Sequence, residues 1–242
     1  MATGTDILDT IRTRLFTAVL GDVMDTRGLT RQFLPPAIRP IDPDTAPARV
    51  MAGRAMPVLE ADCCGDVEWR GAGPGGGPGS GQGGGNPFPF GLMLRALDEL
   101  QRDEVYVCTG GSPRYALWGE LMSTRARALG AAGAVVDGFH RDTLGIRKLG
   151  FPVYSHGSYA QDQRMRGRVI DFRCPIEFGN GVRIDPGDVV VADIDGVVVV
   201  PADHAADIVA LALEKVEGEE SVRQMIERGE RTEDIFGKTG IM

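Results

Sequence analysis

The stretch GELMSTRARALGAAGAVVDGFHRD, residues 119–142, decides how this chain folds. It has helix-forming residues from Gly119 to Gly130, and then an apolar run, AGAVV, that ends in an Asp-Gly turn signal. A helix of ~11 steps at ~1.5 Å per residue and a strand that returns at ~3.3 Å per residue both cover roughly 17 Å. Because the two lengths nearly cancel, we expect Arg141 and Asp142 to lie beside the N-terminus of this helix.

An Arg-Asp pair beside a helix N-terminus has the chemistry of a site for a small acid. The unpaired N–H groups of the first turn hold anions, and Gly119 lets a ligand approach the backbone. Arg141 can grip a carboxylate with two parallel hydrogen bonds, and Asp142 and Glu120 offer hard oxygen ligands for Mg²⁺ or Mn²⁺. Such a group of residues could bind a 2-oxo acid and stabilise its enolate.

The same residues also allow a simpler interpretation. Glu120 in a first helical turn complements the helix dipole, and Arg141 with Asp142 forms an ordinary exposed ion pair worth ~0–1 kcal/mol. His140, beside the pair, is more often a bystander than a ligand contact. Arg114 and Tyr115 precede the proposed pocket and are candidates for contacts with the distal end of a substrate.

Strands and helices alternate along the rest of the chain, which predicts one layered α/β domain over residues 1–242 with a C-terminal helix. Gly21 is expected to divide the first helical segment in two. The predicted helices span 5–28, 89–100, 116–130, 142–150 and 203–229, and the predicted strands span 49–62, 104–111, 132–138, 151–157 and most of 168–201.

Bulk composition excludes several classes of protein. The net charge of −8 makes the chain repel phosphate backbones, so we expect no nucleic-acid partner. No apolar run reaches the ~18 residues that span a membrane, and the N-terminus does not resemble a secretory signal. The four cysteines form no CxxC motif, so we expect reduced thiols in a cytoplasmic protein.

A glycine tract interrupts the pattern at residues 71–85, where ten of fifteen residues are glycine. Glycine loses the most backbone entropy on ordering, so the tract is expected to be a flexible loop. Its role is open between a cover over a pocket and a tolerated surface insertion. Its spacing does not match a dinucleotide-binding fingerprint.

The spaced acidic residue and Arg-Asp pair resemble the central motif of the RraA-like family. This family includes the 4-hydroxy-4-methyl-2-oxoglutarate/4-carboxy-4-hydroxy-2-oxoadipate aldolases and the regulators of ribonuclease activity. Its catalytic members carry an acidic residue, twenty intervening residues and then Arg-Asp, and here twenty residues separate Glu120 from Arg141-Asp142. GDVMD at 21–25 and ADIDGVVVVP at 192–201 are similar to other family segments. The resemblance implies a swivelling β/β/α fold, assembled as a homotrimer or homohexamer with sites at subunit interfaces.

The resemblance also implies a role for each matched residue. Asp142 would ligate the metal directly, Glu120 would hold a metal-bound water, and Arg141 would bind the substrate carboxylate. The anion pocket would be completed at Gly119 by the backbone N–H groups of Glu120, Leu121 and Met122. A carboxylate from the C-terminal helix of a neighbouring subunit would support the metal's waters, and the candidates are Glu217, Glu219 and Glu220.

Two departures from the family pattern bear on the substrate. The aldolases usually have Asp at the position of Glu120, and the tract at 71–85 is not a family feature. The resemblance thus implies a metal-dependent (class II) aldolase that cleaves a 4-hydroxy-2-oxo diacid to pyruvate and a second oxo acid, with oxaloacetate decarboxylation open to the same site. The alternatives are a non-catalytic regulator that binds a ribonuclease or helicase, and a lyase or hydratase acting on a sugar-derived acid.

Overall fold

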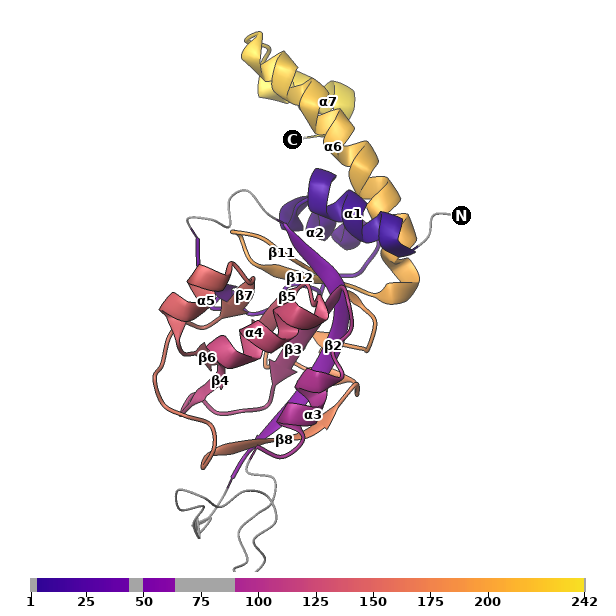
Figure 1. Cartoon of the computed structure of the whole chain (residues 1–242). Helices are drawn as coiled ribbons and strands as arrows, with labels where there is room; N and C mark the ends of the chain where they lie inside the picture. The colour runs from indigo at the N-terminus through magenta and orange to yellow at the C-terminus, as the bar shows by residue number, and fades with distance from the viewer. Residues whose placement is uncertain (1–3, 44–49, 64–89, 242) are drawn as a thin grey trace, which may run out of the picture.

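A computed structural model describes residues 4–43, 50–63 and 90–241 (Figure 1). Its main sheet has eight strands in the order β1-β7-β5-β3-β2-β11-β12, with β8 also paired to β2. The long strand β2 (Met51–Asp62) joins the two halves of this sheet, because it runs parallel to β3 and antiparallel to β8 and β11. The predicted glycine loop at 71–85 lies outside the described residues.

The parallel half of the sheet, with the helices that cover it, contains residues 119–142. Strands β3 (Glu104–Thr109), β5 (Gly133–Val136) and β7 (Val153–Ser155) run parallel, so their carboxyl ends meet at one edge. One face is covered by α3 (Met93–Asp98), α4 (Glu120–Leu129) and α5 (Thr143–Leu149). The other face packs on a hairpin of β9 (Ile176–Glu177) and β10 (Arg183–Ile184).

The antiparallel half packs on the terminal helices. Strands β11 (Val189–Ala192) and β12 (Val197–Val200) share a core with α1 (Gly4–Arg14), α2 (Thr17–Thr26) and the first half of α6 (Ala205–Glu227). Beyond this core α6 extends away from the body, with α7 (Thr232–Thr239) packed along it (Figure 1). The remaining short elements are β1 (Arg39–Pro40), β8 (Gly167–Phe172) and the 3₁₀ turn Ala202–His204.

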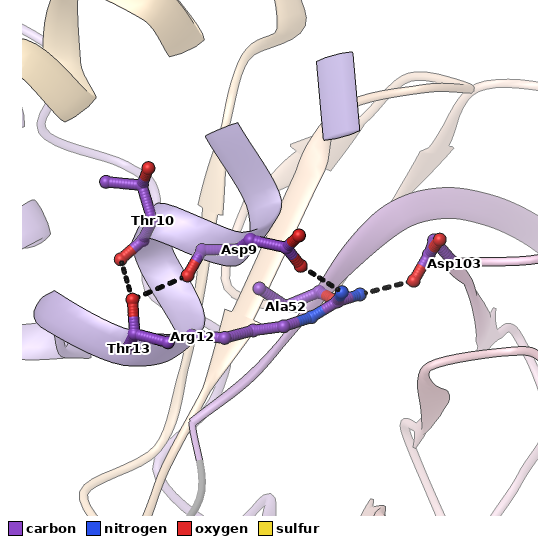
Figure 2. A network of polar contacts seen from close by, with 6 residues as sticks. All are labelled: Asp9, Thr10, Arg12, Thr13, Ala52 and Asp103. Carbon is purple, nitrogen blue, oxygen red and sulfur yellow. Dashed lines mark hydrogen bonds and ion pairs between the residues drawn. The ribbon is translucent and has the colours of Figure 1, made fainter. Parts of the chain in front are cut away.

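One arginine ties α1 to the amino end of the parallel strands (Figure 2). Arg12 Nη2 donates to the carbonyl of Ala52 at 2.7 Å and to Asp103 Oδ1 at 2.6 Å, while Nη1 donates to Asp9 at 3.1 Å. Arg12 and Asp103 also line a cavity of about 690 Å³ at this end of the sheet, together with Asp42 and Arg147. The cavity is therefore on the opposite edge from the carboxyl ends of the strands.

Two predicted boundaries were wrong for reasons that lie far away in the sequence. The first helical segment breaks before Thr17 rather than at Gly21, because Asp193 caps the new helix by accepting from the N–H and the hydroxyl of Thr17. Gly21 stays inside α2, where the Phe33 ring occupies the place of a side chain; an added Cβ would lie 2.3 Å from it.

The other wrong boundary is the start of the helix predicted over 116–130. Its first three residues form a buried strand, β4 (Ala116–Trp118), which pairs in parallel with β6 (Phe139–His140). The other predicted elements occur near their expected positions, and the α/β class with a C-terminal helix is confirmed. In the part of the chain that is described, no helix is both long and apolar enough to cross a membrane.

Candidate active site

The small β4–β6 sheet brings the Arg-Asp pair to the start of α4. The Arg141 N–H donates to the carbonyl of Trp118 at 2.9 Å, which places residue 141 beside the strand that leads into α4. The Glu120 N–H, at the first position of the helix, lies 3.3 Å from Asp142 Oδ2. The predicted meeting of the two halves is therefore present in the fold.

Two glycines allow the acidic side chains to share this small space. A Cβ on Gly119 would lie 2.9 Å from Asp142 Oδ2. A Cβ on Gly145, in the first turn of α5, would lie 2.2 Å from the carboxyl carbon of Glu120. The Glu120 carboxylate thus lies directly over Gly145, a residue that sequence reasoning missed. A glycine within an otherwise regular short helix was the available signal.

The backbone of Asp142 is in an unusual conformation. Its φ is +61°, in the left-handed region, at the residue that precedes α5. This region is rare for residues other than glycine, although aspartate tolerates it better than most. Such strain gathers at functional sites, where the surrounding structure holds it in place. Here it aims the carboxylate at the N-terminus of α4, so the conformation and the placement of the side chain belong together.

Arg141 lies between two carboxylates. Its Nε is 3.6 Å from Asp142 Oδ2, and its Nη1 is 2.9 Å from Asp162 Oδ1. All three side chains are partly exposed, at 39% for Arg141, 44% for Asp142 and 40% for Asp162, so a ligand can reach them. Asp162 was not predicted from the sequence, because it comes from an irregular segment twenty residues beyond the pair.

The backbone N–H groups at the start of α4 are aligned as an anion site requires. The first helical hydrogen bond runs from the Ser123 N–H to the Gly119 carbonyl, so the N–H groups of residues 120–122 precede it. The Glu120 N–H faces Asp142, which leaves those of Leu121 and Met122 for a ligand. The positive end of the helix dipole adds to their attraction for a negative charge.

His140, next to Arg141 in the chain, is buried and is hydrogen-bonded at both ring nitrogens. Its Nδ1 lies 2.7 Å from Ser155 Oγ and its Nε2 lies 2.9 Å from Thr143 Oγ1. Burial, and then the nearby charge of Arg147, lower the pKa of His140 below its usual value, so the ring is neutral near pH 7. Its hydrogen bonds join β6, β7 and α5, which agrees with the interpretation of His140 as a bystander to ligand binding.

Arg114 and Tyr115 face Asp62 at the end of β2. Arg114 Nη2 lies 2.7 Å from Asp62 Oδ2, and the Tyr115 hydroxyl donates to Asp62 Oδ1 at 2.9 Å. Although burial alone would raise the pKa of Asp62, hydrogen bonds from the Ser112 backbone and from Arg114 lower it to about 2. The expected contact of Arg114 and Tyr115 with a substrate's distal end remains a prediction.

A buried carboxyl group lies beside this cluster. Glu60 is 2% exposed and accepts a 2.8 Å hydrogen bond from Gln163 Nε2. Burial raises the pKa of Glu60 to about 8, so it is largely protonated at pH 7. The group is packed against the backbone of Gly167, where an added Cβ would lie 2.4 Å from Glu60 Oε1. Nothing in the pattern of β2 distinguished Glu60 from a surface glutamate.

The three C-terminal glutamates lie along α6, and within one chain each has another partner. Glu217 pairs with Arg14 at 3.0 Å, Glu219 with Lys215 at 3.5 Å, and Glu220 with Arg223 at 2.8 Å. They lie in the second half of α6. Their predicted role concerns a neighbouring subunit, so it stays a prediction.

The carboxylates of Glu120 and Asp142 are candidate ligands for a metal ion. Among the residues that the structure describes, no group of three or more His, Cys, Asp or Glu side chains is arranged to hold a metal. The carboxylates that lie next to the start of α4 are those of Glu120 and Asp142. Mg²⁺ is usually held by one or two carboxylates and keeps several waters, so these oxygen donors suit a magnesium-like ion.

The chain is similar in sequence to several known proteins. A family model described as RraA-like, Aldolase/RraA, matches residues 17–199. A Halalkalibacterium halodurans protein named "Putative 4-hydroxy-4-methyl-2-oxoglutarate aldolase" is 33% identical over 135 residues, which cover 55% of this chain and 63% of that protein. Protein DlpA of Legionella pneumophila is 31% identical over 138 residues, which cover 57% of this chain but only 22% of DlpA.

A solved structure matches the fold over nearly its whole length. It is a Streptomyces coelicolor protein described as an unusual member of the RNase ES inhibitor RraA protein family. The TM-score is 0.73 at 24% identity, with 92% of this chain and 97% of that chain covered. At this identity the likeness concerns the fold alone.

Proposed function

The chain belongs to the RraA-like family, and we propose that within it this protein is a divalent-metal-dependent carbon–carbon lyase that acts on 2-oxo acids. The observation that carries the proposal is the meeting of Glu120, Arg141 and Asp142 at the N-terminus of α4. A regulator that only binds another protein does not need two carboxylates and an arginine beside unpaired backbone N–H groups. The aldolase name of a relative at 33% identity supports the same class of reaction.

Asp142 and Glu120 are the residues that would hold Mg²⁺ or Mn²⁺. When bound there, the cation would act as a Lewis acid on the 2-oxo group of the substrate. In the proposed homotrimer or homohexamer, Glu217, Glu219 or Glu220 of a second copy would add the further carboxylate that one chain lacks. Arg141 would bind the carboxylate next to the 2-oxo group with two adjacent N–H groups.

The proposed reaction breaks the bond between C3 and C4 of a 4-hydroxy-2-oxo diacid. The 4-hydroxyl gives its proton to a water molecule and becomes the carbonyl of a second oxo acid, while the electron pair of the broken bond forms the enolate of pyruvate. The N–H groups of Leu121 and Met122 and the charge of Arg141 stabilise this developing negative charge. A proton added at C3 then gives pyruvate. With oxaloacetate, the bond between C3 and C4 breaks, C4 leaves as CO₂, and the same enolate remains.

The test is a pyruvate-release assay coupled to lactate dehydrogenase. The purified protein is given Mg²⁺ with oxaloacetate or with each of a small panel of 4-hydroxy-2-oxo diacids, with and without a chelator. Since oxaloacetate also loses CO₂ spontaneously in the presence of Mg²⁺, the Asp142→Asn variant at equal concentration sets the background. Metal-dependent release above this background supports the proposal. If no substrate gives any, the lyase assignment is wrong and the regulator interpretation takes its place.

A further inference from the structure

The contact between Asp162 and Arg141 is not explained by the proposed reaction. Asp162 Oδ1 lies 2.9 Å from Arg141 Nη1, while Asp142 Oδ2 lies 3.6 Å from Nε of the same guanidinium. Two of its three nitrogens thus face carboxylates from different segments of the chain. The 2.9 Å contact at Nη1 is within hydrogen-bond distance and the 3.6 Å contact at Nε is a longer electrostatic one, so together the two carboxylates restrict the rotation of the guanidinium.

Asp162 is itself held in place by its own segment. Its Oδ2 accepts from the backbone N–H of Arg164 at 3.1 Å, and its carbonyl accepts from Arg166 Nη1 at 3.0 Å. The preceding residue, Gln161, accepts from the Ala116 N–H at 2.9 Å, which ties the segment to β4. The two carboxylate oxygens of Asp162 therefore have separate partners: Oδ2 bonds the Arg164 N–H within the segment, and Oδ1 faces Arg141.

The next residue anchors the segment in the protein interior. Gln163 is 5% exposed, and its Nε2 donates to the buried Glu60 at 2.8 Å. Its carbonyl accepts from the N–H groups of Arg166 at 2.7 Å and Gly167 at 3.0 Å. Buried polar groups that are hydrogen-bonded in this way favour one conformation, because another would leave a buried polar atom unpaired. Asp162 thus has a rigid support although its own side chain is partly exposed.

We propose that Asp162 is a positioning residue that sets the orientation of the Arg141 guanidinium before a ligand arrives. A guanidinium that is already ordered loses less freedom when it grips a carboxylate, so the ligand binds more tightly and in one orientation. The identity of the ligand as a 2-oxo acid rests on the proposed function. The ordering of Arg141 by Asp162 does not depend on it.

The first experiment measures the order of Arg141 without any ligand. Asp162→Asn keeps an oxygen for the Arg164 N–H and removes the charge that faces Arg141. Nitrogen-15 NMR of the full-length protein reports rotation about the Nε–Cζ bond of each arginine, and Arg141→Lys identifies the Arg141 signal. We expect Arg141 to rotate at least ~5-fold faster in Asp162→Asn than in wild type. The same rate in both proteins would overturn the inference.

A matched control is available in Asp185→Asn. Asp185 forms an exposed pair with Arg183, at 2.9 and 2.8 Å from its Nε and Nη2, on the hairpin at β10. This substitution removes an equivalent charge away from α4, so the rotation of Arg141 should stay as in wild type. Faster rotation of Arg141 in this control would mean that loss of any surface charge loosens it, which would also overturn the inference.

The second experiment measures binding and turnover. The probe is oxalate, which resembles the enolate of pyruvate, and its affinity is measured by calorimetry in the presence of Mg²⁺. We expect ~10-fold weaker binding and a ~10-fold higher KM in Asp162→Asn, with kcat changed less than ~3-fold and an unchanged midpoint of thermal unfolding. Unchanged binding would show that Asp162 does not prepare Arg141 for the ligand, and tighter binding would show that Asp162 competes with the ligand; either result would overturn the inference. If wild type neither binds oxalate nor releases pyruvate, the proposed function fails, while the NMR comparison still decides the role of Asp162.

Discussion

Arg12 and Arg141 lie at opposite ends of the parallel strands, and each is held by two aspartates. Arg12 uses Nε, Nη1 and Nη2 for Ala52, Asp9 and Asp103, so every nitrogen of its guanidinium already has a partner within the fold (Figure 2). Arg141 is more exposed, has one contact at 3.6 Å, and lies beside the unpaired N–H groups of a helix. The surroundings of an arginine, rather than its ion pairs, therefore indicate whether it stabilises the fold or is available to a ligand.

The largest change is expected when the residues proposed to bind the ligand and the metal are altered. Arg141→Lys and Asp142→Asn should each lower kcat/KM about 1,000-fold, equivalent to ~4 kcal/mol, because Lys cannot grip a carboxylate with a planar fork and Asn cannot act as an anionic ligand. Asn tolerates the left-handed conformation of residue 142, so the free energy of unfolding should change by less than ~1 kcal/mol. Steady-state kinetics and urea unfolding measure the two effects. Activity within ~10-fold of wild type would remove these residues from the proposed site.

The reverse result is expected for the arginine that serves the fold. Arg12→Met should lower the free energy of unfolding by ~2 kcal/mol, because the Ala52 carbonyl and Asp103 lose hydrogen bonds to a charged group. Since Arg12 is on the other edge of the sheet, kcat/KM should stay within ~2-fold of wild type. Urea unfolding and the pyruvate assay check both parts. A loss of activity with unchanged stability would contradict the division between the two ends.

The stability of the protein should depend on pH through Glu60, the buried residue that accepts a hydrogen bond from Gln163 next to Asp162. Burial raises the pKa of Glu60 from 4.5 to about 8, so between these values the folded state keeps the proton that the unfolded state loses, and the free energy of unfolding falls as pH rises. The free energy of unfolding should fall by ~1.4 kcal/mol per pH unit over most of the interval from pH 6 to 8. Over this interval wild type should therefore lose ~2 kcal/mol more of its free energy of unfolding than Glu60→Gln does. Urea unfolding at the two pH values measures this difference. Equal losses would show that Glu60 is ionised in the folded protein.

A milder change in activity is expected at Gly145, which lies against the Glu120 carboxylate. Gly145→Ala should lower kcat/KM ~10-fold, because the added methyl displaces the Glu120 carboxylate, while helix propensity favours alanine by ~0.5–1 kcal/mol in stability. Gly237→Ala, in α7, is the control, since its methyl would meet no atom within 4 Å. Gly237→Ala should raise the free energy of unfolding by ~0.5–1 kcal/mol and leave kcat/KM unchanged. If both variants are fully active, the position of Glu120 does not matter to the reaction.

The sequence predicted the parts of the site that depend on local geometry. Glu120 and Asp142 could be brought together because one helix and one returning strand separate them, and the lengths of both follow from residue counts. Asp162 could not be predicted, since its approach to Arg141 depends on the Gln163–Glu60 bond across more than a hundred residues. The break before Thr17 escaped prediction for the same reason, because its cap comes from Asp193.

Strand β2 has a consequence for how this chain can change in evolution. Its residues 51–54 pair with β11, 54–59 with β3 and 58–62 with β8. One residue gained or lost inside it would turn every later side chain to the other face, and would put Glu60 where a neighbouring apolar residue now packs. The pairing of β2 with β8 already has one irregularity, between Leu59 and Glu60, so a change of length is easier to accommodate after the strand has ended. The glycine tract at 71–85 comes after Asp62 in the chain, so a change in its length would add or remove no residue of β2.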